Sequence, residues 1–136
     1  MLVDLHSLNP WAIVVATVAA FFIGGIWYAP PVFGNRWMAA LGKSKRELTG
    51  PVKPMVTQFL ATLACAAVLA MVITRFGAIT WIEGAATGFV LAVGLIATTQ
   101  LGEWMFCNFS MRLYWIQVSF KIVNLTVMGA ILGAWR

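Results

Sequence analysis

Four long runs of predominantly apolar residues constrain this chain more than any other feature of its sequence. They cover about residues 10–28, 55–75, 81–104 and 111–135. A helix needs about 20 apolar residues to cross the hydrocarbon core of a bilayer, and its backbone groups must pair within the segment. We therefore expect an all-α integral membrane protein whose four transmembrane helices form an antiparallel bundle in one domain, residues 1–136.

The composition agrees with a membrane protein. Of the 136 residues, 62% are hydrophobic and 10% are charged, whereas a soluble domain carries about 25% charged residues. Such a chain cannot cover its surface with polar groups. The net charge of +5 does not indicate a nucleic-acid partner, because the basic residues gather beside the apolar runs and not on an amphipathic face with interleaved aromatics.

The basic residues also predict how the helices are oriented. Five of the nine Lys and Arg residues lie in the connection between the first two runs, residues 29–54. They are Arg36, Lys43, Lys45, Arg46 and Lys53. Because positive charge favours the cytoplasmic side, we expect this connection in the cytoplasm and both termini outside. Within it, Ser44 and Glu47 form a capping-box pattern that predicts a short amphipathic helix.

Other local patterns predict helix starts and helix packing. Asn9 before Pro10 is a typical helix start, and Thr80 with Glu83 forms a second capping-box pattern. Small residues recur every fourth position, a spacing that lets helices approach closely. These residues are Ala12, Ala16, Ala20 and Gly24, then Gly84, Gly88 and Ala92, then Gly129 and Gly133. The pattern favours packing within one chain over a homodimer seam.

A polar stripe interrupts the last apolar run. Its members are three or four residues apart, so they share one helix face. A lysine near the middle of a membrane costs at least about 2.5–3.5 kcal/mol, so Lys121 should face other helices and have polar partners there. Its side chain tilts towards the N-terminus of its helix, the level of the polar end of the third run. We predict an interhelical polar cluster of Lys121, Gln117, Asn124, Glu103, Thr98, Gln100 and Tyr114.

Two interpretations of this cluster stay open. In the first, it lines a cavity that opens to the cytoplasm and binds an anionic or carbonyl-bearing ligand such as a lipid headgroup. In the second, the polar groups hold the helices together and Lys121 extends towards the interface. In either case we expect Gly94, which has no side chain, to face Lys121 and leave room for it.

Side chains that support catalysis or bind metals are scarce. The one histidine, His6, and the one aspartate, Asp4, both lie in the N-terminal tail. Acid–base or nucleophilic catalysis needs partners within hydrogen-bond reach, and a zinc site needs three or four ligands. We therefore expect no metal, no cofactor and no enzymatic activity. The remaining enzymatic alternative is acid–base chemistry on a lipid by Glu103 and Lys121.

The first connection carries a family resemblance. From Trp27 to Trp37 the chain reads Trp-Tyr-Ala-Pro-Pro-Val-Phe-Gly-Asn-Arg-Trp, which resembles the Trp-Tyr-x-Pro-x-x-Phe-Gly-x-x-Trp stretch of domain-of-unknown-function (DUF) family 1761. The segment from Gly129 to Trp135 resembles the Gly-Ala-Ile-Leu-x-x-Trp ending of that family. The matching residues are Trp27, Tyr28, Pro30, Phe33, Gly34, Trp37, Gly129 and Trp135. The resemblance implies a small four-helix protein of the bacterial inner membrane, and it implies no activity.

These features favour a non-enzymatic membrane protein, either an accessory or scaffold subunit or a lipid-binding interaction protein. Its expected partners are membrane lipids and either a second copy or a larger membrane complex. The alternative is a small homo-oligomeric transporter or channel that uses a polar cavity around Lys121 for an anionic substrate. A cation–proton exchanger of the small multidrug type is disfavoured, because the first apolar run contains no acidic residue.

Overall fold

The computed structural model describes residues 4–41, 52–78 and 80–135, and within these ranges the chain is helical apart from short turns. Four helical stretches there are long and apolar enough to cross a membrane. They are α1 (Pro10–Trp27), α3 (Val52–Phe76), the continuous stretch Trp81–Cys107 and α6 (Met111–Ala134). They coincide with the four apolar runs and indicate a multi-pass membrane protein.

Two helices begin where the sequence predicts. The side-chain oxygen of Asn9 accepts hydrogen bonds from the backbone N–H groups of Trp11 and Ala12, at 3.0 and 3.3 Å. The hydroxyl of Thr80 accepts from the N–H of Glu83, and the Glu83 carboxylate accepts from the N–H of Thr80, both at 3.2 Å. These bonds satisfy donors that a helix start leaves unpaired.

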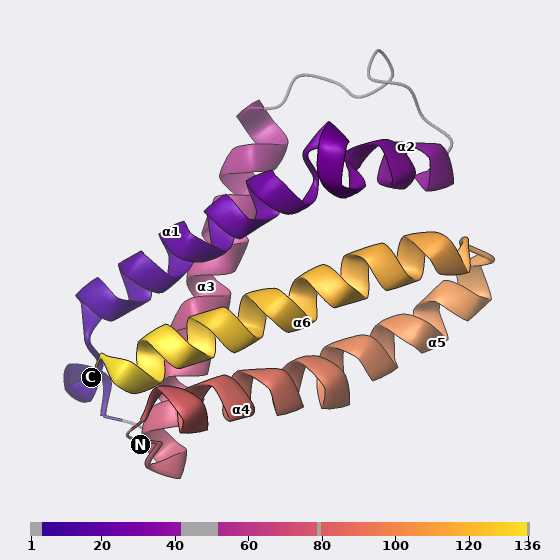
Figure 1. Ribbon diagram of the computed structural model, residues 1–136. Helices are drawn as coiled ribbons and strands as arrows, with labels where there is room; N and C mark the ends of the chain where they lie inside the picture. The colour runs from indigo at the N-terminus through magenta and orange to yellow at the C-terminus, as the bar shows by residue number, and fades with distance from the viewer. Residues whose placement is uncertain (1–3, 42–51, 79, 136) are drawn as a thin grey trace.

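The third apolar stretch contains a π-helical turn. It consists of α4 (Trp81–Leu91), the π-helix η3 (Ala92–Ala97) and α5 (Thr98–Cys107). A π-helical turn holds more residues than an α-helical one, so it changes which face each later residue occupies. Asn108, with a left-handed φ of 56°, ends α5. Helix α6 then returns beside α4 and α5 in the opposite direction (Figure 1).

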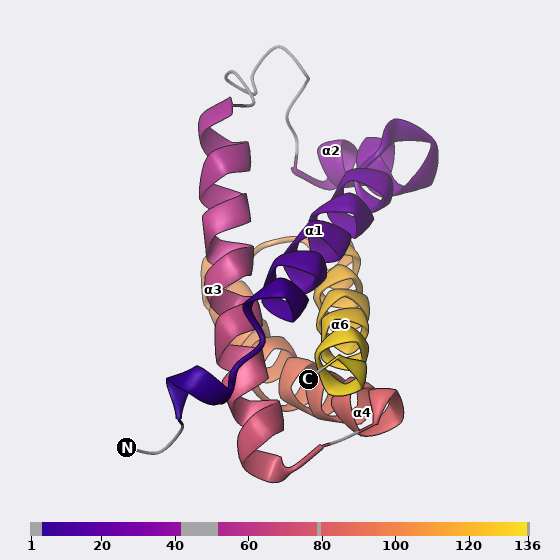
Figure 2. The same ribbon diagram turned by 90° about the vertical axis from the view of Figure 1, so that its left-hand side faces the viewer.

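Helix α6 is the element on which the other long helices pack. In Figure 1, α1 lies along one side of α6, and α4 and α5 lie along the other. Helix α3 crosses α1 and α6 steeply, as the two ribbon views show (Figure 1; Figure 2). The regular antiparallel bundle expected from the sequence is therefore not confirmed, because α3 is not aligned with the other three.

The small residues of α4 and α6 pack against each other within the chain. A Cβ atom added to Gly84 would collide with the carbonyl of Gly129, and one added to Gly129 would collide with the carbonyl of Gly84. One turn further on, a Cβ at Gly88 would collide with the carbonyl of Leu125. The expectation that these seams serve packing within one chain is thus confirmed for α4 and α6.

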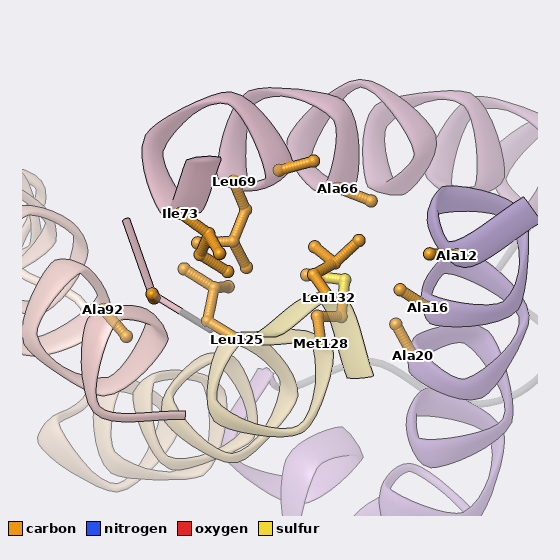
Figure 3. Packing of buried hydrophobic residues seen from close by; sticks show 12 residues of the cluster. Ala12, Ala16, Ala20, Ala66, Leu69, Ile73, Ala92, Leu125, Met128 and Leu132 are labelled. Atoms are coloured by element: carbon orange, nitrogen blue, oxygen red, sulfur yellow. The ribbon is translucent and has the colours of Figure 1, made fainter. Parts of the chain in front are cut away.

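The alanines of α1 belong to the central apolar cluster. Ala12, Ala16 and Ala20 are buried and point towards Met128 and Leu132 of α6 (Figure 3). Because alanine side chains are short, α1 can lie close to α6 here.

Helix α3 supplies the other half of this cluster. Leu69 and Ile73 lie beside Leu125 of α6, and Ala66 lies nearer to α1 (Figure 3). Larger side chains therefore fill the space where α3 crosses α6.

A corner follows α1 in the first connection. It consists of a π-helical turn, η2 (Pro30–Gly34), and a short helix, α2 (Asn35–Leu41). The N–H of Gly34 donates to the carbonyl of Ala29 at 3.0 Å, and a Cβ at Gly34 would collide with backbone atoms of the preceding turn. The sequence pattern did not indicate α2. The helix predicted around residues 44–47 lies outside the described residues.

Aromatic residues of the family motif hold this corner together. Trp27 stacks with Phe33, with ring centres 4.8 Å apart, and Tyr28 meets Trp37 edge-on at 5.3 Å. The indole N–H of Trp27 also donates to the carbonyl of Ile116 at 3.1 Å, which ties the corner to α6. The motif residues therefore place Tyr28 and Trp37 beside α6.

Candidate functional site

A cavity of about 730 Å³ lies between α1, α3 and α6, next to α2. Its size falls within the range of small-molecule sites, roughly 300–1,000 Å³. Most of its lining is apolar or aromatic. The polar lining side chains are Tyr28, Trp37, Gln58, Thr62, Gln117, Lys121 and Asn124. Among the described residues that line the cavity, Lys121 alone carries a charge.

Lys121 is held by a chain of amide groups that joins α6 to α5. Its ammonium donates a hydrogen bond to Oε1 of Gln100 at 2.8 Å, and Nε2 of Gln100 donates to Oε1 of Gln117 at 3.3 Å. Gln100 is buried and Lys121 is partly exposed to the cavity. The structure therefore brings three of the seven predicted cluster residues into one hydrogen-bonded group.

Gly94 does not face Lys121, contrary to expectation. It is exposed, and a Cβ added there would meet nothing within 4 Å. Gly94 lies inside the π-helical turn η3, which alters the faces of the residues around it. The side chain of Lys121 instead bonds to Gln100 on α5. It therefore extends towards the N-terminal end of α6, the direction in which helical side chains tilt.

Three other predicted residues have no hydrogen bond to this group in the described structure. Thr98 is exposed, and its hydroxyl donates to the carbonyl of Gly94 at 2.7 Å. Glu103 is exposed on α5, and its negative charge acts on the ammonium of Lys121. Tyr114 is buried, and its hydroxyl donates to the carbonyl of Ala97 at 2.7 Å, so it ties α6 to the end of η3.

Two cavity-lining residues carry buried polar atoms without a hydrogen-bond partner in the described structure. They are Oδ1 of Asn124, in a side chain that is 6% exposed, and Nε1 of Trp37. Leaving a buried donor or acceptor unpaired costs about 1–3 kcal/mol, and such atoms are rare in native proteins. One orphan atom is an acceptor and the other is a donor, and both belong to residues that line the same cavity.

Two exposed basic residues are next in sequence to residues that line the cavity. Lys53 immediately precedes Pro54, and Arg36 immediately precedes Trp37; both basic side chains are exposed, and Pro54 and Trp37 line the cavity. The lining itself consists mainly of apolar residues. They include Phe21, Cys65, Leu125 and Met128.

Sequence reasoning missed part of this site. Gln58 and Thr62 lie one turn apart on α3, and Nε2 of Gln58 donates to the Thr62 hydroxyl at 3.2 Å. Two polar residues at this spacing in an apolar run were the available signal. Trp37 and Tyr28 were noted only for the family motif. In the part of the chain that the structure describes, no three His, Cys, Asp or Glu side chains gather where they could hold a metal.

Comparison with known proteins agrees with the resemblance seen in the sequence. A family model described as "Protein of unknown function (DUF1761)" matches residues 11–133. No curated protein and no solved structure matches the chain. The matched region contains the corner, α3, α4 and α5, and nearly all of α1 and α6. The chain therefore belongs to the DUF1761 family.

Proposed function

We propose that this protein is a non-enzymatic membrane protein that holds an anionic lipid in the cavity between α1, α3 and α6. In this proposal the four long helices cross the bacterial inner membrane in alternating directions. The 29–54 connection is cytoplasmic and both termini are outside, as the distribution of basic residues favours. Arg36 and Lys53, which are next in sequence to the lining residues Trp37 and Pro54, then lie near the cytoplasmic leaflet.

The observation that carries this proposal is the environment of Lys121. Its hydrogen-bond partner, Gln100, is a neutral amide and does not neutralise the ammonium charge. A lysine ammonium has three donors, and this bond uses one of them. An anionic group in the cavity would accept from the remaining donors and offset the cost of a charge in an apolar site.

The rest of the lining favours an amphiphile over a small inorganic anion. Phe21, Cys65 and Met128 offer apolar surface that a hydrocarbon chain can cover. The exposed Arg36 and Lys53 adjoin the lining residues Trp37 and Pro54 in sequence and add positive charge there. Near a membrane surface, each basic residue contributes about 1 kcal/mol to the attraction of anionic lipids. A lipid with its headgroup near Lys121 matches both the apolar lining and this positive charge.

Native mass spectrometry after mild extraction tests this proposal. We expect the wild-type protein to retain an anionic lipid, and Lys121→Met to lose it. Arg112→Met is the matched control, because Arg112 is exposed and does not line the cavity. Equal retention by Lys121→Met and the control would refute lipid binding at this site.

A bound lipid suits an accessory or scaffold role, in which the protein presents or stabilises a lipid beside a partner protein. A stoichiometric second protein in the same spectra would identify that partner. A homodimer in the spectra would indicate self-association instead.

The second candidate function is transport of an anionic substrate by a homo-oligomer. The observation that favours it is the π-helical turn η3, which contributes Ile96 to the cavity wall; π-helical turns are frequent at functional sites. Salt-sensitive anion flux in liposomes, lost in Lys121→Met, would support transport over lipid retention.

A further inference from the structure

The hydrogen bonds around Gln100 fix the orientation of the Gln117 amide. A lysine ammonium only donates, so the Gln100 atom that it meets at 2.8 Å is the oxygen, Oε1. The Gln100 nitrogen therefore faces Gln117, and because an amide nitrogen also only donates, it meets Oε1 of Gln117, at 3.3 Å. The chain of bonds runs in one direction, from Lys121 through Gln100 to Gln117, and leaves Nε2 of Gln117 as its unused end.

Nε2 of Gln117 is an accessible donor without a partner among the described residues. It differs in this from Nε1 of Trp37 and Oδ1 of Asn124, which are unpaired but buried. The Gln117 side chain is half-buried and lines the cavity one turn before Lys121 on α6. Both side chains bond to the same Gln100 carboxamide, so they lie close enough for one phosphate group to accept from both.

The charges near this pair of donors limit the charge of the ligand. Among the described residues that line the cavity, Lys121 alone is charged. Glu103, which is not part of the lining, adds a negative charge that acts on the Lys121 ammonium. One ammonium balances one negative charge. A second negative charge on the ligand would stay uncompensated in a mainly apolar cavity, where an unpaired charge is costly.

We infer that Gln117 is a second binding residue for the lipid headgroup, and that Lys121 and Gln117 together select the singly charged phosphodiester of a phospholipid. This inference rests on the proposed function and specifies the lipid class and a specificity-determining residue. One non-bridging oxygen of the phosphodiester accepts from the Lys121 ammonium, and the other accepts from Nε2 of Gln117.

A phosphomonoester headgroup fits the same pair of donors less well. With two negative charges it leaves one of them unbalanced. With one negative charge it keeps a P–O–H donor, whereas the oxygens of Gln100 and Gln117 each accept a bond already. The phosphodiester has one charge and no hydrogen to donate, so it matches the ammonium and the amide N–H together.

Two synthetic lipids that differ by one methyl group isolate the headgroup charge. Phosphatidylmethanol is a phosphodiester with one negative charge, and phosphatidic acid with the same acyl chains is a phosphomonoester that carries about two near pH 8.5. The full-length protein is placed at this pH in nanodiscs of phosphatidylcholine with equal amounts of the two lipids, then released and analysed by native mass spectrometry. We expect the wild-type protein to retain phosphatidylmethanol about five- to tenfold more than phosphatidic acid.

Variants of Gln117 assign this preference to its amide nitrogen. Gln117→Met removes the donor at similar length, and we expect it to retain about tenfold less phosphatidylmethanol. Gln117→Lys adds a second positive charge, so it should reverse the preference in favour of phosphatidic acid, which a residue that only supports Gln100 would not do. Ser119→Lys is the matched control on α6, because Ser119 does not line the cavity, and it should keep the wild-type preference.

A further variant covers the case in which Gln117→Met is too unstable to purify. Gln117→Glu keeps an acceptor for Nε2 of Gln100 and places a carboxylate where the donor was. We expect it to lose both lipids while its melting temperature in detergent stays near that of the wild-type protein. Retention of phosphatidylmethanol by Gln117→Glu at the wild-type level would show that Gln117 does not contact the headgroup.

The outcomes separate this inference from the proposed function. If Lys121→Met loses both lipids but the wild-type protein retains them equally, or Gln117→Lys leaves the preference unchanged, this inference is wrong and lipid binding stands. If wild type and Lys121→Met retain both lipids alike, lipid binding itself is wrong. Protein extracted from its own membrane should carry a phospholipid by mass; a bound water-soluble phosphodiester in its place would overturn the lipid assignment.

Discussion

Nζ of Lys121 lies 2.8 Å from Oε1 of Gln100, although the two residues are 21 positions apart on different helices. Gln100 in turn donates to Gln117, one turn before Lys121 on α6. Lys121, the only charged residue among the described residues that line the cavity, is thus held by a chain of neutral amides. This arrangement orients the ammonium without neutralising it, which suits a residue that binds an anion.

Removing the Gln100 amide should destabilise the protein. In Gln100→Leu the ammonium of Lys121 loses its acceptor, and a polar group left unpaired in a buried site costs about 1–3 kcal/mol. Thermal unfolding in detergent should show a lower melting temperature for this variant. Thr98→Val, on the same helix but exposed, should change the melting temperature much less. Equal effects of the two substitutions would mean that the Lys121–Gln100 bond contributes nothing specific.

Removing the Asn124 amide should have the opposite effect. Oδ1 of Asn124 is buried without a partner, so Asn124→Leu removes an unmet hydrogen-bond requirement. We expect the lipid-free protein to gain about 1 kcal/mol in free energy of unfolding. Gln117→Leu is the matched comparison on α6, because Gln117 accepts a bond from Gln100 and its loss should destabilise. A loss of stability in Asn124→Leu, measured after delipidation, would show that this amide is already satisfied.

A methyl group on the contact between α4 and α6 should separate the two helices. In Gly129→Ala the new Cβ collides with the carbonyl of Gly84, which is backbone and cannot move aside alone. Overpacking of this kind costs about 1–3 kcal/mol. Gly102→Ala is the control, because a Cβ there meets nothing within 4 Å and alanine is the better helix former. Unfolding curves in which Gly129→Ala is as stable as Gly102→Ala would contradict the close contact.

The orientation in the membrane is tested by thiol labelling in a background of Cys65→Ala and Cys107→Ala. We expect Lys45→Cys to react with an impermeant reagent only after the cells are opened, because the basic 29–54 connection favours the cytoplasm. Ser7→Cys, in the exposed turn before α1, should react in intact cells. Labelling of Lys45→Cys from outside intact cells would reverse the proposed orientation.

The apolar runs and their caps were predictable because they depend on neighbours in the sequence. As expected, α1 begins at Pro10 with Asn9 as its N-cap, and α4 begins at Trp81 after the capping box of Thr80 and Glu83. Gly84 and Gly129 were also expected at helix faces that can approach closely, since small residues recur there at every fourth position. That these two glycines pack against each other was not predicted.

The partner of Lys121 was predicted only in part. Gln100 and Gln117 were expected near it, and so were Thr98 and Glu103, which are exposed on α5. An α-helical count along the third run cannot separate these residues, because the π-helical turn η3 shifts the faces of those that follow. The prediction that Gly94 faces Lys121 was wrong for the same reason.

The amino-acid pattern alone was enough to predict four long apolar helices, where two of them start and which small residues allow close helix packing. These properties follow from local hydrogen bonding and from the length of apolar runs. The folded chain was needed to show that α4 packs on α6, that α3 crosses α6 steeply, that the corner at Gly34 brings Trp37 to the cavity, and that Oδ1 of Asn124 is buried without a hydrogen-bond partner. Those features depend on crossing angles and on contacts between distant residues, which residue spacing along one chain does not specify.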